Sequence, residues 1–220
     1  MMGLALKRLI DIVVATVALV LCAPLLIAVA TAILLTMGRP VLFRQERIGL
    51  GGRRFTILKF RSMTTDVEGR GTTGDGDRLT PLGRWLRDTS LDELPSLWNV
   101  LRGEMSLVGP RPLPNRYRFR YSPTQFRRHQ VRPGLTGLAQ VNGRNGLDWD
   151  EKFAYDVWYV EHRSVLLDLV ILARTARAVL RREGITAPGS ATAHEFLGSA
   201  QQAGCAAPAP LPVAAGEAAR

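Results

Sequence analysis

The sequence predicts a membrane-associated domain of the α/β class that is mostly helical, and three observations lead to this prediction. Residues 12–38 form a run of 27 residues without a charge. Two apolar-rich runs around a glycine-rich turn indicate a small β-hairpin, and several short or amphipathic helical patterns follow as far as residue 182. We therefore expect a membrane segment over residues 1–38, a folded domain over 39–185, and a disordered Ala/Pro/Gly-rich tail over 186–220.

The composition points to anionic partners. The chain of 220 residues is 46% hydrophobic, enough for one core, and carries 29 basic against 19 acidic residues. A net charge of +10 suits phospholipid head groups, nucleotides or nucleic acid. Two cysteines, Cys22 and Cys205, cannot build a disulfide framework or a cysteine metal site, and the three histidines fall at no metal-ligand spacing, so zinc is not expected.

The apolar N-terminal run has three interpretations. Its length suits a helix that spans the membrane. Pro24 lies at its midpoint, however, and removes a backbone hydrogen bond there. Each arm is then about 20 Å long, too short to cross a core of about 30 Å, so a bent, re-entrant helix fits, with Lys7, Arg8 and Arg39 on one side of the membrane. The third interpretation is a signal peptide with a cleavage site at 28–30.

The next segments form a hairpin and a loop. Residues 41–48 and 53–63 read as two strands around the glycine-rich turn 49–52, whose glycines lack the spacing of a phosphate-binding loop. Residues 64–79 read as a loop with solvated acidic side chains. Residues 81–87 then form a short helix with Pro81 in its first turn, and residues 90–101 form another that Gly103 ends.

Asp92 and Glu93 are adjacent carboxylates at the start of that second helix, where Pro95 predicts a bent first turn. The pair could hold a divalent cation and attack phosphorus, while Arg87, Arg102 and Arg111 nearby could bind phosphate oxygens. Alternatively, Ser90 and Glu93 form a capping box that only ends the helix. The two interpretations are compatible.

The remaining segments are a turn, two loops and further helices. Residues 110–112 (Pro-Arg-Pro) cannot be helical. Residues 115–129 interleave arginine with aromatic residues, as on a nucleic-acid surface or on a helix with one basic face. Residues 132–137 and 142–146 are loops, and residues 149–162 and 165–182 are helices. In the last helix Arg174, Arg177 and Arg181 form a stripe beside apolar residues, which suits either a membrane interface or a core helix.

Four motifs resemble one family, in the order and spacing in which they occur. They are KFRSM (59–63), SLDELPSLWNVLRGEMSLVGPRP (90–112), RPGLTGLAQVNGR (132–144) and YDVWYVEH (155–162). Together with the apolar N-terminal segment they closely resemble the bacterial sugar transferases known as monotopic phosphoglycosyl transferases, over residues 7–182. The chain resembles the minimal form, without the additional N-terminal membrane region of larger relatives.

The resemblance implies transfer of a sugar 1-phosphate from a UDP-sugar to undecaprenyl phosphate, at the cytoplasmic face of the bacterial inner membrane. The products are UMP and the lipid-diphosphate-linked sugar that starts a surface glycan. It also implies a re-entrant membrane segment kinked at Pro24, although Ala23 replaces the serine that often precedes the kink. Anionic membrane lipids are expected partners and nucleic acid is not. The sugar, the pathway and an oligomeric state are left open.

The resemblance assigns roles to individual residues. Asp92 matches the nucleophile of a two-step reaction with a covalent aspartyl phosphosugar, and Glu93 matches the ligand of Mg²⁺. Positions that bind phosphate or substrate fall on Lys59, Arg61, Arg87, Arg111 and Arg144. The alternative is a non-catalytic, membrane-anchored protein that binds nucleic acid or other anions through its arginines, but this leaves Asp92, Glu93 and the order of the motifs unexplained.

Overall fold

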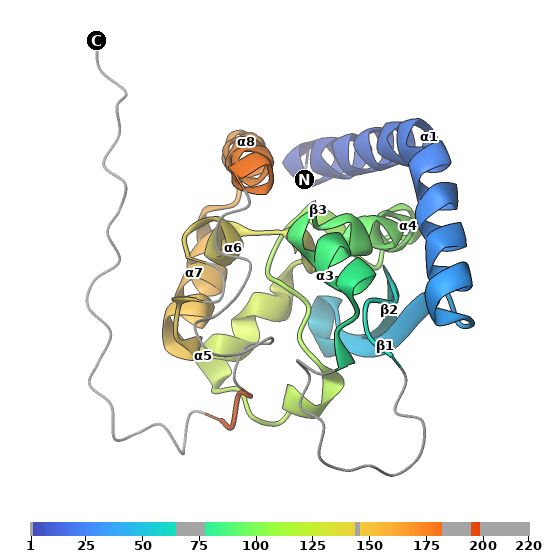
Figure 1. Cartoon of the computed structure of the whole chain (residues 1–220). Coiled ribbons are helices and arrows are strands. Elements are labelled where there is room, and N and C mark those ends of the chain that lie inside the picture. The colour runs from blue at the N-terminus through green and yellow to red at the C-terminus, as the bar shows by residue number, and fades with distance from the viewer. Residues whose placement is uncertain (1, 65–77, 144–145, 182–194, 199–220) are drawn as a thin grey trace.

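The computed structural model describes residues 2–64, 78–143, 146–181 and 195–198, and it is mostly helical, with two sheets of two strands each (Figure 1). In chain order the elements are α1 (Met2–Met37), β1 (Leu42–Ile48), η1 (Leu50–Gly52), β2 (Arg54–Phe60), α3 (Pro81–Asp88), η2 (Leu91–Ser96), α4 (Leu97–Arg102), β3 (Ser106–Val108), η3 (Asn115–Tyr117), α5 (Pro123–Phe126), η4 (Arg127–Gln130), β4 (Gly134–Thr136), α6 (Leu138–Val141), α7 (Trp149–His162) and α8 (Val165–Arg181).

Helix α1 is long, apolar and sharply bent into two arms (Figure 1). Pro24 is the proline inside it, which accounts for the bend because its ring displaces the preceding turn. Ala15 of the first arm packs into the main core, whereas Val29 and Ile33 of the second arm pack against Phe60 of β2. By length and composition α1 could cross a membrane, and only 11% of its most apolar stretch is buried.

Polar side chains fasten the first arm of α1 to the domain. Asp11 is buried and accepts hydrogen bonds from the hydroxyl of Ser106 (2.8 Å) and the backbone N–H of Leu107 (3.1 Å). Arg8 donates to the carbonyl oxygens of Val100 and Leu101 in the last turn of α4, where helical carbonyl groups run short of backbone donors. The charges at this end of α1 therefore serve as docking groups.

The hairpin predicted for residues 41–63 is confirmed. Strands β1 and β2 pair antiparallel, with Leu42 opposite Phe60 and Ile48 opposite Arg54. The turn uses the positive φ angles of Gly51 and Gly52, which glycine adopts without steric cost. Residue 59 of β2 is thereby placed beside η2, the segment that follows α3.

A second sheet was not predicted. The prediction of a plain loop over residues 132–137 is wrong, because residues 134–136 form β4, which pairs in parallel with β3. The two backbones approach so closely that a Cβ atom on Gly134 would lie 2.1 Å from the backbone nitrogen of Gly109. Glycines at these positions therefore allow the pairing, and the pairing holds the chain that leads into the Pro-Arg-Pro turn.

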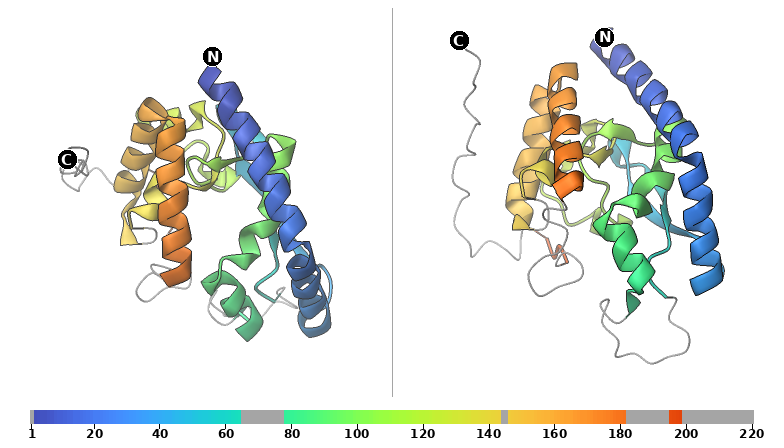
Figure 2. Two further views of the ribbon diagram at one scale, coloured as in Figure 1. Left: turned by 90° about the horizontal axis from the view of Figure 1, so that it is seen from above. Right: turned by 45° about the horizontal axis from the view of Figure 1, so that its top comes forward.

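The C-terminal part agrees with the predictions in its last two helices, differs over residues 115–129, and decides between the two interpretations of α8. Helices α7 and α8 form as expected, but residues 115–129 break into η3, α5 and η4 instead of one helix. Apolar residues of α8, including Leu166 at 73% exposure and Leu169 at 51%, face outward, so α8 is not a plain core helix. Helix α8 lies on the same side of the molecule as the first arm of α1 (Figure 2).

Two predicted segments lie largely outside the described residues. Of the loop predicted over residues 64–79, residues 65–77 are not described. Of the tail predicted as disordered over residues 186–220, the structure describes only residues 195–198. These pack against the domain, where Phe196 is fully buried.

Candidate active site

Asp92 and Glu93 lie on η2, a 3-10 helix that continues directly into α4. Ser90 precedes them with a φ of 57°, a left-handed conformation that is rare for serine and is often found beside functional sites. The Ser90 side chain makes no capping hydrogen bond, so the capping-box interpretation is wrong. The carboxylate of Glu93 is therefore available for other partners, and Pro95 inside η2 agrees with the predicted bent turn.

Two buried polar residues fix η2 and α4 to strand β2. Ser96 donates a 2.6 Å hydrogen bond to the carbonyl oxygen of Leu58, and Asn99 accepts one of 3.1 Å from the N–H of the same residue. The Asn99 amide also donates to the carbonyl oxygen of Thr56. These bonds set the register between β2 and η2, so that Lys59 faces Glu93. The sequence analysis did not identify Ser96 or Asn99. Two polar residues in an otherwise apolar helical segment could have indicated that their side chains bind a neighbouring strand.

Glu93 accepts two charged hydrogen bonds on one oxygen. Lys59 Nζ lies 2.5 Å from Glu93 Oε1, and Arg111 Nη2 lies 2.7 Å from the same atom. Burial would raise the pKa of Glu93, but the two cations outweigh it and hold the pKa well below its usual value. The two cations thus favour the ionised form of Glu93, and neither donor uses its second oxygen.

Asp92 is buried at 8% exposure, and its environment differs from that of Glu93. Burial and then the charge of Glu93 raise its pKa to about 6, whereas Lys59, Arg111 and Arg87 act in the opposite direction. Two neighbouring carboxylates whose pKa values are moved apart have different chemical roles. Asp92 is the poorly solvated one of the pair, and an ionised carboxylate there is a stronger nucleophile than one in water.

Arg87 approaches Asp92 from α3, and a close backbone contact holds this helix in place. A Cβ atom on Gly83 would lie 1.8 Å from the carbonyl oxygen of Ser62, so only glycine lets α3 sit this near the chain after β2. The Ser62 hydroxyl in turn accepts a 3.0 Å hydrogen bond from Arg87 Nε. Ser62 belongs to the KFRSM motif, which therefore supplies Lys59 to Glu93 and orients Arg87.

A buried ion pair holds the backbone of Arg111 in place. Arg128 and Asp156 are 2% and 3% exposed, and the Arg128 guanidinium donates to Asp156 Oδ2 from Nε (3.0 Å) and Nη2 (2.7 Å). The same Nη2 donates to the carbonyl oxygen of Arg111 at 2.7 Å. Asp156 belongs to the YDVWYVEH motif on α7, so this motif acts on the site through Arg128.

Arg47 is a cation of the site that sequence reasoning missed. A pocket beside Glu93 is lined by Arg47, Ile57, Lys59, Glu93, Ser96, Met105, Arg111, Pro112, Gly134 and Leu135. Burial and then the charge of Arg111 lower the pKa of Arg47 to about 10. Its Nη1 donates to the carbonyl oxygen of Pro112 at 3.3 Å, and its buried Nε has no partner in the part of the chain that is described. The pocket therefore holds Lys59, Arg111 and Arg47 around one glutamate.

Two other predicted positions do not reach this site, and a third is not described. Arg61 is buried and donates to the carbonyl oxygens of Met37, Gly38 and Arg39, so it holds the end of α1 and not a substrate. Arg102 is 60% exposed and pairs with Glu104. Arg144 lies outside the described residues.

The arginines of residues 115–129 are largely paired within the protein. Arg116 and Arg120 contact Glu195, Arg127 contacts Glu161, and Arg128 contacts Asp156. This segment is not a row of free cations, which removes the feature that suggested a nucleic-acid surface.

The carboxylates of Asp92 and Glu93 suit Mg²⁺ if the ion is also bound by a substrate. Among the described residues no group of three His, Cys, Asp or Glu side chains could enclose a metal. Mg²⁺, however, commonly binds to one or two carboxylates and completes its shell with water and substrate phosphate. The ionised form of Glu93 is favoured by Lys59 and Arg111, its second oxygen is bound by neither of them, and Asp92 is its neighbour.

The comparisons with known proteins show the family to which the chain belongs. A family model of bacterial sugar transferases matches residues 2–182. The chain is 49% identical over 196 residues to an uncharacterized sugar transferase, EpsL, of Bacillus subtilis, which covers 88% of this chain and 96% of that protein.

Two further relatives carry names that state an activity. A UDP-glucose:undecaprenyl-phosphate glucose-1-phosphate transferase of Caulobacter vibrioides is 47% identical over 186 residues (79% of this chain, 69% of that protein). An undecaprenyl-phosphate galactose phosphotransferase of Salmonella typhimurium is 38% identical over 197 residues, which are 81% of this chain but only 41% of that protein. Their names differ in the sugar.

Proposed function

The chain belongs to the bacterial sugar transferase family, and we propose that it transfers a sugar 1-phosphate from a UDP-sugar to undecaprenyl phosphate. The products are UMP and undecaprenyl-diphosphate-sugar, the first lipid-linked unit of a surface glycan such as an exopolysaccharide, O-antigen, capsule or glycoprotein glycan. The observation that carries the proposal is the pair of carboxylates in unlike environments: Asp92 is buried, and its neighbour Glu93 binds Lys59 and Arg111, with Arg87 nearby.

The first step forms a covalent bond to Asp92. Its ionised carboxylate attacks the phosphorus atom that bears the sugar, the bridging P–O bond of the diphosphate breaks, and UMP departs with the electron pair. Lys59, Arg87 and Arg111 offset the repulsion between the anionic nucleophile and the diphosphate, because fixed cations stabilise charge that develops on phosphate oxygens. Mg²⁺, bound through Glu93, would supply further charge neutralisation at the same oxygens.

The second step uses the same site in reverse. A phosphate oxygen of undecaprenyl phosphate attacks the phosphorus atom of the aspartyl phosphosugar, the bond to Asp92 breaks, and the carboxylate is regenerated. Splitting the transfer lets both phosphorylated substrates use one set of cations in turn. The hydrogen bond from Arg128 to the backbone carbonyl oxygen of Arg111 helps to hold this cation at the site for both steps.

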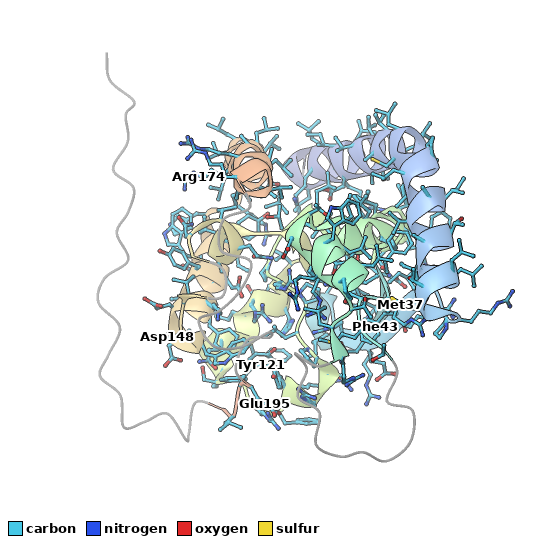
Figure 3. The ribbon with its side chains drawn as sticks, in the orientation of Figure 1. Met37, Phe43, Tyr121, Asp148, Arg174 and Glu195 are labelled. Atoms are coloured by element: carbon cyan, nitrogen blue, oxygen red, sulfur yellow. The ribbon has the colours of Figure 1, made fainter. Side chains whose placement is uncertain are left out.

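We further propose that α1 is re-entrant, with both of its ends and the domain at the cytoplasmic face of the inner membrane. Both arms pack on the same domain, through Ala15 on one side of the bend and Val29 on the other, so a straight helix would separate one arm from its contacts. Helix α8 lies on the same side of the molecule as the first arm (Figure 2), and its Leu166, Leu169 and Arg174, the last labelled in Figure 3, are exposed. Such a face suits the interface of anionic lipids.

The test is release of UMP from a panel of UDP-sugars by the purified protein, with undecaprenyl phosphate and Mg²⁺ present. We expect one sugar, or a closely related group, to yield UMP and a lipid-linked product in equal amounts. Asp92→Asn serves as the matched control because it preserves shape and removes the nucleophile. Absence of UMP and of lipid-linked product from every UDP-sugar in a folded preparation would contradict the proposal.

A further inference from the structure

Phe196 lies in an aromatic cage on the face of the domain around η3 and α7. Its side chain is fully buried, although it follows a stretch of chain that is not described. Its ring centroid lies 4.9–5.8 Å from those of Tyr117, Tyr121, Trp149 and Phe153, at distances typical of favourable aromatic pairs. The cage therefore contacts Phe196 from several sides and fits one aromatic ring.

The residue before Phe196 is held by an arginine clamp at the rim of the cage. Glu195 Oε1 accepts a 2.8 Å hydrogen bond from Arg120 Nη1 and lies 3.4 Å from Arg116 Nε. Figure 3 shows Glu195 on the same side of the molecule as Tyr121. Both arginines also lie near the ring of Tyr117, at 5.4 Å for Arg116 and 5.2 Å for Arg120, which limits their freedom before any carboxylate binds.

The backbone of Phe196 is bound at both of its polar groups. Its N–H donates to the hydroxyl of Tyr117 at 3.3 Å, and its carbonyl oxygen accepts a 2.5 Å hydrogen bond from Arg120. Side-chain fit, charge and backbone hydrogen bonds together are the features by which proteins recognise short peptide segments. Leu197 is 59% exposed and takes no part.

We propose that this cage and clamp form a peptide-binding site for an acidic residue followed by an aromatic residue, filled by the chain's own Glu195-Phe196 segment. The segment lies beyond residues 2–182, which the family model matches, whereas the cage and the clamp lie within them. The occupant is the chain's own tail because its carboxylate and ring match the two halves of the site.

The site is connected to the dyad through the hydrogen bonds of Arg128. Phe196 stacks on Tyr121, whose hydroxyl accepts a hydrogen bond from Arg128 Nη1 at 3.3 Å. Arg128 Nη2 donates to the carbonyl oxygen of Arg111. A bound tail therefore restricts Tyr121, and through it the residue that supports Arg111.

Hydrogen exchange of the full chain in lipid nanodiscs tests the docking without any substrate. In the Phe196→Ala variant the amides of residues 115–130 should exchange about tenfold faster than in the parent, because the cage loses its occupant. The matched control is Leu197→Ala, whose side chain is exposed and which should leave the exchange unchanged. Equal exchange in the parent and in Phe196→Ala would overturn the proposal.

A peptide supplied in trans tests the recognition itself. A peptide of residues 191–200, added to the Phe196→Ala chain at about 1 mM, the concentration scale of a tethered segment, should restore protection of residues 115–130. The same peptide carrying Phe196→Ala or Glu195→Lys should not, and the parent chain should not respond because its site is filled. Failure of the natural peptide to restore protection, or equal action of the altered peptides, would overturn the recognition of an acidic-aromatic pair.

Discussion

The guanidinium of Arg128 donates a 2.7 Å hydrogen bond to the backbone carbonyl oxygen of Arg111, the residue whose own guanidinium binds Glu93. One buried arginine thus positions another at the dyad, and Asp156 balances its charge. This relationship explains why the YDVWYVEH motif accompanies the Pro-Arg-Pro turn, although α7 itself supplies no group to the dyad in the part of the chain that is described.

Asp156→Asn should destabilise the protein by about 3–5 kcal/mol, because it leaves the buried charge of Arg128 without a counter-ion. Glu161→Gln is the control: it removes the partner of Arg127 in an ion pair whose side chains are 42% and 40% exposed, and should cost less than about 1 kcal/mol. Thermal or denaturant unfolding measures both. Equal effects in the two variants would show that Asp156 does not carry the buried charge balance.

Asp92→Asn should abolish turnover and leave the protein folded, membrane-bound and more stable above pH 6. The folded-state pKa of Asp92 is raised from 3.8 to about 6, so the folded protein binds the proton more tightly than the unfolded chain. Stability therefore falls as pH rises from about 3.8 to about 6, and the loss persists at higher pH. The Asp92→Asn substitution removes this loss in the free energy of unfolding, which is worth about 1–3 kcal/mol. The stabilisation relative to the parent should vanish below pH 4.

Thermal unfolding of the parent and of Asp92→Asn at pH 4 and pH 8 measures that difference. Near-normal turnover by purified Asp92→Asn would contradict the covalent mechanism. An unchanged stability difference between the two pH values would instead contradict the buried, raised-pKa carboxylate.

The rate of the first step should depend on the ionisation of Asp92. Below pH 6 the rate of UMP release should fall about tenfold per pH unit, because only the ionised carboxylate attacks phosphorus. Single-turnover release without undecaprenyl phosphate is the suitable measurement, since the lipid phosphate then adds no titration of its own. A rate that stays constant from pH 8 to pH 5 would exclude Asp92 as the group that must be ionised.

Glu93→Gln should raise the Mg²⁺ concentration needed for half-maximal activity by about tenfold or more, since an amide is a much weaker ligand for Mg²⁺ than a carboxylate. The control is Glu46→Gln on the hairpin, where Glu46 is 60% exposed in its contact with Arg54. Titration of UMP release with Mg²⁺ compares the variants. A Glu93→Gln protein that loses only thermal stability, with its metal response intact, would assign Glu93 a purely structural role.

Pro24→Ala should allow α1 to straighten. In part of the protein population the N-terminus should then lie on the periplasmic side, and these molecules should be inactive. Without the proline one helix of about 40 Å becomes possible for the apolar run, long enough to span. The contacts of Val29 and Ile33 on one arm oppose this change, so we expect a mixed population.

Cysteine labelling in intact cells determines the membrane topology of α1. Single cysteines replace Gly3 or Ala200 in a Cys22→Ala, Cys205→Ala background. In the parent both positions should be protected from a reagent that cannot cross the inner membrane. Labelling of Gly3 from the periplasm in the parent, with Ala200 protected, would show that α1 spans the bilayer and is not re-entrant.

Local signals in the sequence determined the elements that depend on neighbouring residues. The bend of α1 follows from Pro24, the hairpin from the glycines of its turn, and helices α3, α7 and α8 from their patterns. The adjacent carboxylates were also evident, because Asp92 and Glu93 need no folding to be neighbours. Each of these predictions rests on interactions between residues close together in the chain.

Tertiary contacts decided which cations join the carboxylates. Arg61 has the same charge as Arg111 and lies two residues from Lys59, yet it points to the end of α1. Arg47 looked like an ordinary strand residue, yet it lines the pocket. The cause is the register between β2 and η2 and the close packing of glycine backbones, which join segments far apart in sequence. The sequence alone thus determined the pair of adjacent carboxylates, and the tertiary structure decided its electrostatic surroundings, because charge acts through distance and burial and not through chain order.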